Sequence, residues 1–248
     1  MEPSKEPTLK DPILAPPGVL TLMSNDDLTY WLFIPSVPCS GPRPSMLFLH
    51  GAGGVNNPSN VRSQSLTRML DSPSYASKIP HIIIMPIAPQ RDWTQHTSKV
   101  LTLLDSLIES LNLDSTKITL SGQSMGGHGV WNLAQQSPTR WSTIIPICGY
   151  VDRSDPTPLP STFSLTELRS SNIWLFHGED DSVVSVQHSD NIVEALRALG
   201  ASDNLKYTRY ASGVSPPCKT KVKDLVGHGC YELAFKEEEL WKWIESKW

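Results

Sequence analysis

The sequence Gly122-Gln123-Ser124-Met125-Gly126 decides how this chain should fold. It has the pattern G-x-S-x-G, and it lies between the apolar run Lys117–Leu120 and a segment of helical pattern from Gly127 to Gln136. A G-x-S-x-G between a strand and a helix forms a turn so sharp that the serine adopts strained backbone geometry. Glycines are needed on both sides because a Cβ there would collide with the neighbouring strand or helix. The pattern therefore predicts that Ser124 projects above a sheet as a nucleophile.

A serine nucleophile needs a base and an acid that orients the base. In the α/β-hydrolase fold these follow the serine in the order acid, then histidine. The apolar run Ile173–Phe176 leads into an acidic loop, in which Glu179, Asp180 and Asp181 compete for this role. We favour Asp181 because it directly precedes the apolar segment around Val183 and should turn inward. The other two acids, nearer the turn, are typical of solvated loop charges.

Of the seven histidines, His228 is the expected base, because it follows the acidic loop late in the chain within the turn Gly227-His228-Gly229. His188 also follows the acid, but it lies in the helical pattern of residues 186–199 and is expected at the surface. His177 should pack beneath the site as a strand-end residue. His128 stands four residues after Ser124, so it either faces the pocket or is an ordinary helix residue.

A glycine-rich loop, His50-Gly51-Ala52-Gly53-Gly54, follows the apolar run Met46–Leu49. Such a loop lets backbone N–H groups approach a developing oxyanion closely. By analogy with the H-G-x arrangement of this fold, we assign one donor to the Ala52 N–H, with Gly53 as the alternative. The second donor is expected from Met125, the residue after the nucleophile. The residues expected to line the substrate site are Trp93, Gly51 and Gly53, with ordinary packing as the alternative for Trp93.

The composition favours one α/β domain of 248 residues, of which 39% are hydrophobic. A net charge of −4 offers no electrostatic footprint for nucleic acid or an anionic membrane. The first residues have no apolar segment of a secretory signal, and no apolar run approaches the roughly 20 residues of a membrane helix. We therefore expect a cytoplasmic protein without a membrane span or a nucleic-acid partner.

The four cysteines, Cys39, Cys148, Cys218 and Cys230, lack metal-ligand spacing and are too few for a disulfide framework. Cys148 lies in an apolar run and is expected to be a buried thiol. No metal site and no organic cofactor is predicted.

Apolar strand patterns alternate with helical patterns along the chain, which predicts a doubly wound, mostly parallel sheet with helices on both faces. Residues 1–18 are Pro-rich and are expected to form a loosely attached arm, so that residues 19–248 make up the domain. Residues 150–172 should form an excursion over the site. Strands are expected at residues 28–34, 46–49, 81–85, 117–120, 141–148, 173–177 and 205–210, the first of them antiparallel and at the sheet edge. Helices are expected at residues 63–70, 100–111, 127–136, 186–199 and 237–247.

The segments Gly122–Trp131, Pro146–Gly149, Trp174–Val184 and Gly227–His228 resemble the α/β-hydrolases known as predicted peptidases and the related dienelactone hydrolase and phospholipase/carboxylesterase families. The resemblance covers roughly residues 45–248. It implies an α/β-hydrolase fold without a large cap domain and a catalytic triad of Ser124, Asp181 and His228.

Two features depart from the pattern of these families. Residues 212–226, with a Pro-Pro pair and three lysines, look like an insertion before the histidine loop. Such a loop could border the substrate pocket, or it could be a solvated insertion with no role. Tyr231 stands where the families more often have Trp.

The reaction expected from these residues is hydrolysis of a carboxylic ester with a small or short-chain acyl group, through an acyl-enzyme intermediate. The same machinery would serve a thioesterase or a peptidase. A different class of protein, a receptor that binds a ligand on a hydrolase scaffold, is the other alternative. The expected partner is a small-molecule ester, and the sequence makes no prediction of oligomeric state.

Overall fold

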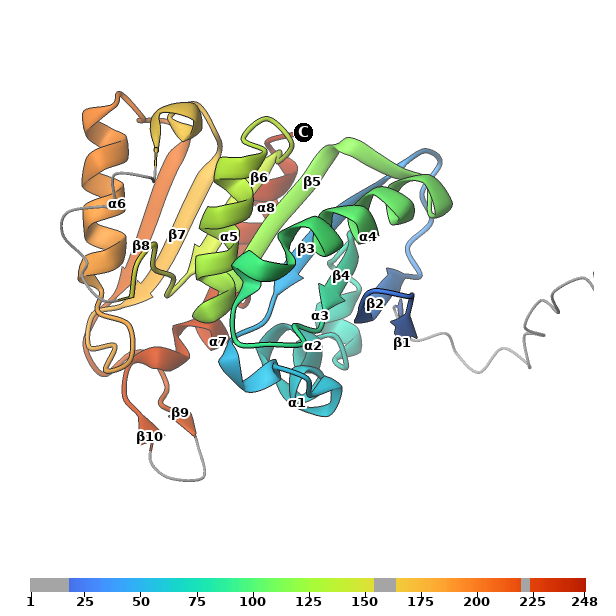
Figure 1. The fold of residues 1–248 in the computed structure, drawn as a ribbon, viewed down its shortest axis with the longest axis horizontal. Helices are drawn as coiled ribbons and strands as arrows, with labels where there is room; N and C mark the ends of the chain where they lie inside the picture. Colours follow the sequence, from blue (N-terminus) through green and yellow to red (C-terminus); the bar gives the residue numbers. More distant parts are fainter. Residues whose placement is uncertain (1–17, 154–163, 220–223) are drawn as a thin grey trace, which may run out of the picture.

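The computed structural model describes residues 18–153, 164–219 and 224–248, which form an eight-stranded sheet covered by helices (Figure 1). The strand order is β1-β2-β4-β3-β5-β6-β7-β8. Strands β3 to β8 are parallel to one another, whereas β2 is antiparallel to both β1 and β4. The strands are β1 (Gly18–Ser24), β2 (Thr29–Pro35), β3 (Arg43–Leu49), β4 (Ile82–Pro86), β5 (Leu113–Gln123), β6 (Thr143–Ile147), β7 (Ile173–Gly178) and β8 (Leu205–Tyr210). The predicted mostly parallel α/β fold is confirmed.

Helices cover both faces of the sheet, and each face has its own hydrophobic core. The helices are α1 (Pro58–Ser63), α2 (Ser65–Met69), α3 (Pro73–Ala76), α4 (Thr97–Ser110), α5 (Met125–Gln136), α6 (Gln187–Ala198), α7 (Tyr231–Ala234) and α8 (Glu238–Glu245). Buried side chains of α4, α5 and α6 share one core, and those of α2, α7 and α8 share the other. Alternate residues of a strand point to opposite faces, so that Leu47 joins the first core and Phe48 the second.

Strand β2 was expected at the sheet edge, and that expectation is wrong. Strand β1 pairs with it in antiparallel register, from Gly18 opposite Pro35 to Ser24 opposite Thr29, and forms the edge itself. Most residues of β1 are exposed, including Val19 at 58%, so its sequence has little of the alternation that marks a half-buried strand. The proposed arm of residues 1–18 lies outside the described residues except for Gly18, which begins β1.

The single helix expected at residues 63–70 is instead two short helices, α1 and α2. They are separated at Gln64, whose backbone is extended with φ −79° and ψ 158°. Helix α1 begins at Pro58, directly after Asn57, whose side chain accepts a hydrogen bond from the Asn60 N–H. An Asn cap followed by proline is a typical helix start. The predicted helix followed the hydrophobic pattern alone, which does not include this cap.

The segment 212–226 contains two short antiparallel strands, β9 (Cys218–Lys219) and β10 (Asp224–Leu225), which belong to no other sheet among the described residues. They project from the body of the molecule at the end where β7 and β8 finish (Figure 1). That this segment is an insertion relative to similar proteins stays a prediction.

The turn from β5 into α5 depends on two close backbone contacts. A Cβ on Gly126 would lie 1.9 Å from the carbonyl oxygen of Leu49 in β3, and a Cβ on Gly122 would lie 2.6 Å from the carbonyl oxygen of Gly126. Real Cβ atoms do not approach backbone atoms so closely. Glycine at both positions therefore lets α5 pack directly against the end of β3.

We expect Gly126→Ala to destabilise the protein by about 2 kcal/mol or more, because the new methyl group has to displace the backbone of β3. The midpoint of thermal or urea unfolding measures the effect. Gly41→Ala is the matched control, since a Cβ on Gly41 meets nothing within 4 Å. Equal unfolding midpoints for the two variants would contradict this account of the turn.

Candidate active site

Ser124 lies between the end of β5 and the start of α5 with φ +54° and ψ −118°. A non-glycine residue rarely adopts this conformation, which costs on the order of 1–3 kcal/mol. Two backbone hydrogen bonds hold it: the Ser124 N–H donates to the Ile147 carbonyl at 2.9 Å, and the Ser124 carbonyl accepts from the His128 N–H at 3.1 Å. The predicted strained turn at this serine is therefore present.

The structure brings Ser124, His228 and Asp181 into one chain of hydrogen bonds. The Nε2 atom of His228 lies 3.0 Å from the Ser124 Oγ, and its Nδ1 atom lies 2.8 Å from the Asp181 Oδ2. The Asp181 side chain is inaccessible to solvent, and that of His228 is 6% exposed. Because the carboxylate requires a proton on Nδ1, the neutral ring has an unprotonated Nε2 that can accept the serine proton.

Asp181 is buried but well provided with donors. Its Oδ1 accepts hydrogen bonds from the N–H groups of Val183 and Val184 at 2.8 and 3.0 Å. The His177 Nε2 lies 3.4 Å from Oδ2. Burial by itself raises the pKa of Asp181, but the bonds from His177 and His228 and the charge of His228 outweigh it, so that the pKa lies well below its usual range. The carboxylate is consequently ionised at neutral pH.

His177 packs beneath the site, as predicted. Its Nε2 lies 2.9 Å from the Val184 carbonyl, and its Nδ1 lies 2.7 Å from the Ser189 hydroxyl. The carbonyl can only accept a hydrogen bond, so Nε2 carries the proton and Nδ1 accepts from the hydroxyl. His177 therefore presents an N–H toward the acid loop and fixes its shape from below.

The two neighbouring acids bind the start of the 212–226 segment. The Asp180 carboxylate accepts from the Gly213 N–H at 2.9 Å, and the Glu179 carboxylate accepts from the Ser212 N–H at 3.2 Å. Arg209 also donates to Glu179 at 3.1 Å. The expectation that these acids are merely solvated is corrected, because each holds a backbone N–H of the next loop.

A left-handed glycine brings the histidine loop against the acid loop. Gly227 has φ +69°, and a Cβ there would lie 2.5 Å from the Asp180 backbone. The Val226 carbonyl accepts from the Ser182 N–H at 3.0 Å, and the Pro216 carbonyl accepts from the Gly229 N–H at 3.0 Å. The base of the 212–226 segment thus braces the turn that carries His228.

The glycine-rich loop lies beside Ser124, because a Cβ on Gly51 would be 3.5 Å from the Cβ of Ser124. Ala52 is the first residue of a 3-10 helix, η1 (Ala52–Gly54), and Met125 is the first residue of α5. The first N–H groups of a helix have no partner within that helix. Both N–H groups proposed for the oxyanion hole are therefore at positions where a ligand oxygen can satisfy them. Gly53 is exposed, and its carbonyl accepts from the Asn60 side chain.

The side chains of His50 and Trp93 support this loop from below. The His50 Nδ1 donates to the Gly51 carbonyl at 2.7 Å, and its Nε2 accepts from the Ala88 N–H at 3.0 Å. Burial lowers the pKa of His50 to about 4, although the bond to Gly51 opposes the shift, so the ring is neutral. The H-G-x pattern contained His50, but the sequence analysis assigned this side chain no role.

Trp93 was expected to line the substrate site, and the structure corrects this expectation. Its side chain is 1% exposed, packs against Gly129 of α5 and donates from Nε1 to the His50 carbonyl at 3.0 Å. The alternative of ordinary packing is the observed one. Trp93 positions the glycine-rich loop from within the core.

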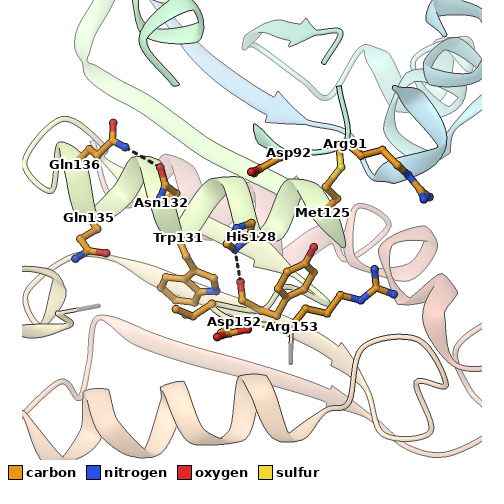
Figure 2. Close-up of a pocket in the computed structure, with 12 residues that line it drawn as sticks. Arg91, Asp92, Met125, His128, Trp131, Asn132, Gln135, Gln136, Asp152 and Arg153 are labelled. Atoms are coloured by element: carbon orange, nitrogen blue, oxygen red, sulfur yellow. Dashed lines mark hydrogen bonds between the residues drawn. The ribbon is translucent and has the colours of Figure 1, made fainter. Parts of the chain in front are cut away.

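A cavity of about 820 Å³ begins at Met125, next to the nucleophile, and runs along α5 (Figure 2). Its lining residues come from the loop before α4, from α5 and from residues 150–153. They are Arg91, Asp92, Met125, His128, Trp131, Asn132, Gln135, Gln136, Tyr150, Val151, Asp152 and Arg153. Residues 150–153 begin the predicted excursion over the site, of which residues 154–163 lie outside the described residues.

Two further histidines, His128 and His188, lie close to the ring of Tyr150. His128 faces this cavity and stacks on Tyr150, with ring centroids 4.9 Å apart and 8° between the planes (Figure 2). His188 was expected at the surface, but it is 5% exposed and lies 6.2 Å from the Tyr150 ring. The helical pattern alone did not reveal that this end of α6 is covered by the loop after β6.

The ligand atoms of Cys148, Asp181 and His228 lie within 4.8 Å of one another, a spacing that a metal ion could occupy. The carboxylate and the imidazole are already hydrogen-bonded to each other, however. Burial raises the pKa of the Cys148 thiol well above its usual value, so the thiol is protonated. The group is therefore arranged for proton transfer between Ser124 and His228 rather than for coordination. Cys148 is buried, as predicted.

Comparisons with known proteins find similarity in sequence to one family and in fold to many solved structures. A family described as "Putative esterase" matches residues 84–206. A solved thermostable esterase is 24% identical with a TM-score of 0.67, and the match covers 93% of this chain and 63% of that chain. This chain therefore spans less than two thirds of the length of that esterase. None of the curated proteins compared matches the chain in sequence.

Two further solved structures match over nearly their whole length. The fluorophosphonate-binding serine hydrolase F of Staphylococcus aureus is 13% identical with a TM-score of 0.65, covering 92% of this chain and 98% of that chain. An S-formylglutathione hydrolase from Agrobacterium tumefaciens is 14% identical with a TM-score of 0.63, covering 95% and 97%. At these identities the likeness establishes the fold alone. No helix among the described residues is long and apolar enough to cross a membrane.

The site geometry predicts which acid matters for hydrolysis of a 4-nitrophenyl ester. Asp181→Asn should lower kcat by roughly 10⁴-fold, because the amide no longer holds the reactive tautomer of His228. Asp180→Asn and Glu179→Gln should change kcat by only a few fold, since an amide oxygen can still accept from Gly213 or Ser212. A loss at Asp180 as large as that at Asp181 would refute the assignment.

Proposed function

We propose that this chain is a serine hydrolase of the α/β-hydrolase superfamily that cleaves carboxylic esters through an acyl-enzyme intermediate. The observation that carries the proposal is the continuous hydrogen-bonded chain from the Ser124 Oγ through His228 to Asp181, with links of 3.0 and 2.8 Å. It starts from a serine in strained geometry and ends at an ionised, buried carboxylate. This combination is suited to making a hydroxyl group nucleophilic at neutral pH.

In the proposed reaction, the Ser124 Oγ attacks the ester carbonyl carbon while the His228 Nε2 takes the serine proton. Asp181 keeps the Nδ1 proton and stabilises the imidazolium that forms. The tetrahedral intermediate collapses as the C–O bond to the alcohol breaks, and His228 passes its proton to the departing alkoxide. A water molecule then attacks the acyl-enzyme with His228 again as the base, which releases the acid and restores Ser124.

The developing oxyanion is assigned to the N–H groups of Ala52 and Met125. Met125 stands at the first position of α5, where the aligned peptide dipoles favour negative charge, and Ala52 begins the short 3-10 helix η1, whose first N–H groups have no partner within it. Removing one such donor typically costs about 3 kcal/mol of transition-state stabilisation. Support for this assignment comes from Gly51, which holds the loop against the Ser124 side chain, and from His50 and Trp93, which fix the loop from below.

The ester expected as substrate is small or has a short acyl chain. In support, the connection from β6, which ends at Ile147, to β7, which begins at Ile173, is too short for a helical cap domain. The sequence left open whether the 212–226 segment borders the substrate pocket. The cavity beside Met125 draws its walls from other segments, and the described part of 212–226 instead braces the His228 loop.

Thioesterase and peptidase activities use the same machinery, and a receptor on a hydrolase scaffold would bind an ester without turnover. A panel of 4-nitrophenyl esters, matching thioesters and short peptide amides separates these readings. Faster turnover of the esters supports the proposal, whereas binding without any turnover would support the receptor.

The Ser124→Ala variant should lose ester turnover and labelling by a fluorophosphonate probe while keeping the wild-type unfolding midpoint. The reason is that the Ser124 hydroxyl is hydrogen-bonded to the His228 Nε2, the ring nitrogen that can accept its proton. Ser106→Ala, which removes an exposed hydroxyl that is hydrogen-bonded to Leu103 within α4, is the control and should react like the wild type. Stoichiometric labelling of the Ser124→Ala protein would refute the proposed nucleophile.

A further inference from the structure

The cavity along α5 begins at Met125, which follows the proposed nucleophile in the chain, and this proximity is the premise for placing part of a substrate in the cavity. Met125 and His128 are on the first turns of α5 and both line the cavity. Figure 2 shows Arg91 and Arg153 reaching from opposite sides toward the end where Met125 lies. These two side chains come from loops far apart in the sequence, and the cavity brings them to one mouth.

Both guanidinium groups are free of carboxylate partners within the described part of the chain. Arg62, Arg68, Arg140 and Arg209, by contrast, each form an ion pair with an Asp or Glu. Arg91 and Arg153 are exposed at the cavity mouth. Two unpaired guanidinium groups in a concave site make that part of it attractive to an anion.

Neither acid of the cavity forms an ion pair with Arg91 or Arg153 in the described part of the chain. The Asp92 carboxylate caps the 3-10 helix η2 (Trp93–His96), accepting from the Thr94 N–H at 2.9 Å, the Thr94 hydroxyl at 2.7 Å and the Gln95 amide at 3.3 Å. Asp152 lies toward Trp131 rather than toward the two guanidinium groups (Figure 2). The two guanidinium groups therefore remain available to an anion at the mouth, beside Met125.

The wall between the arginines and α5 is aromatic and held in place. The Tyr150 ring lies on the His128 ring, and the His128 Nδ1 is 3.1 Å from the Tyr150 carbonyl. On the mouth side, the Arg153 guanidinium carbon lies 6.0 Å from the centre of the Tyr150 ring. A guanidinium over an aromatic face is partly oriented before a ligand arrives. The wall thus offers a flat surface for the body of a substrate and directs Arg153 to its end.

We propose that Arg91 and Arg153 select ester substrates that carry a carboxylate group, which they bind at the mouth of the cavity while the scissile carbonyl lies at Ser124. The planar guanidinium fork matches a carboxylate in a bidentate manner. The inference rests on the proposed esterase function and specifies its substrate class.

Two matched pairs of esters test the proposal. In the first pair the acyl group bears the charge: the mono-4-nitrophenyl ester of adipic acid is compared with its methyl ester. In the second pair the alcohol bears the charge: 4-carboxyphenyl butyrate is compared with its methyl ester. Each ester is assayed with the wild type, Arg91→Gln, Arg153→Gln and the double variant. Arg169→Gln, which removes an exposed arginine outside the cavity, is the matched control.

The measured quantity is the loss of kcat/KM from wild type to variant on each ester, so that differences in chemical reactivity between esters cancel. We expect the double variant to lose about tenfold or more on the charged member of one pair, and less than twofold on its methyl ester. The pair that responds identifies whether the acid or the alcohol side carries the carboxylate. The charged-ester loss should shrink at high salt concentration, since screening weakens the ion pair.

Equal losses on the charged and methyl esters of both pairs would overturn the inference, as would an Arg169→Gln variant that behaves like the double variant. Failure of the proposed function has a different signature. In that case the methyl esters would not be hydrolysed and Ser124 would not react with a fluorophosphonate, and the inference would fall with it. Ser124-dependent hydrolysis of the methyl esters without a charge preference refutes the carboxylate selection alone.

Discussion

The strained backbone at Ser124 is the constraint on which the rest of the site depends. A serine with φ +54° persists only because its surroundings determine that conformation more strongly than its own preference does. The N–H group of Ser124 is held by the end of β6, its carbonyl begins α5, and Gly126 lets the helix touch β3. One turn therefore joins three neighbouring parts of the fold. The turn presents the Ser124 side chain to His228, whose Nε2 lies 3.0 Å from the Ser124 Oγ.

The acid and histidine loops keep the Asp181 carboxylate ionised although it is inaccessible to solvent. Burial opposes ionisation of Asp181, and the structure answers with two backbone N–H groups and two imidazoles. His177 is as important here as His228, although it does not touch Ser124. Gly227 then lets the two loops come into contact, so that the distance between the carboxylate and His228 is set by backbone packing rather than by flexible side chains.

The cavity differs in character from the hydrogen-bonded site beside it. The site is built around a buried carboxylate and a buried imidazole that are paired with each other, whereas the mouth of the cavity presents two arginines without carboxylate partners in the described chain. On the proposed function, Ser124 and His228 supply the reactivity and the two arginines supply the selection among related esters. A substrate that carries a carboxylate would provide the ion pair that these arginines lack. Discrimination would thus come from the loops around α5, and reactivity from the turn at its beginning.

The sequence by itself determined most of the order of strands and helices, although not β1, together with the strained turn and the three residues of the hydrogen-bonded chain. Those features depend on local chemistry: glycines beside Ser124, an apolar run before the acidic loop, and glycines around His228. Only the tertiary structure decided which side chains surround them. It placed β1 outside β2, turned Trp93 into the core, buried His188, and brought Arg91, His128 and Arg153 to one cavity. Contacts between distant segments follow from how helices and loops pack on the sheet, and no local pattern of residues encodes them.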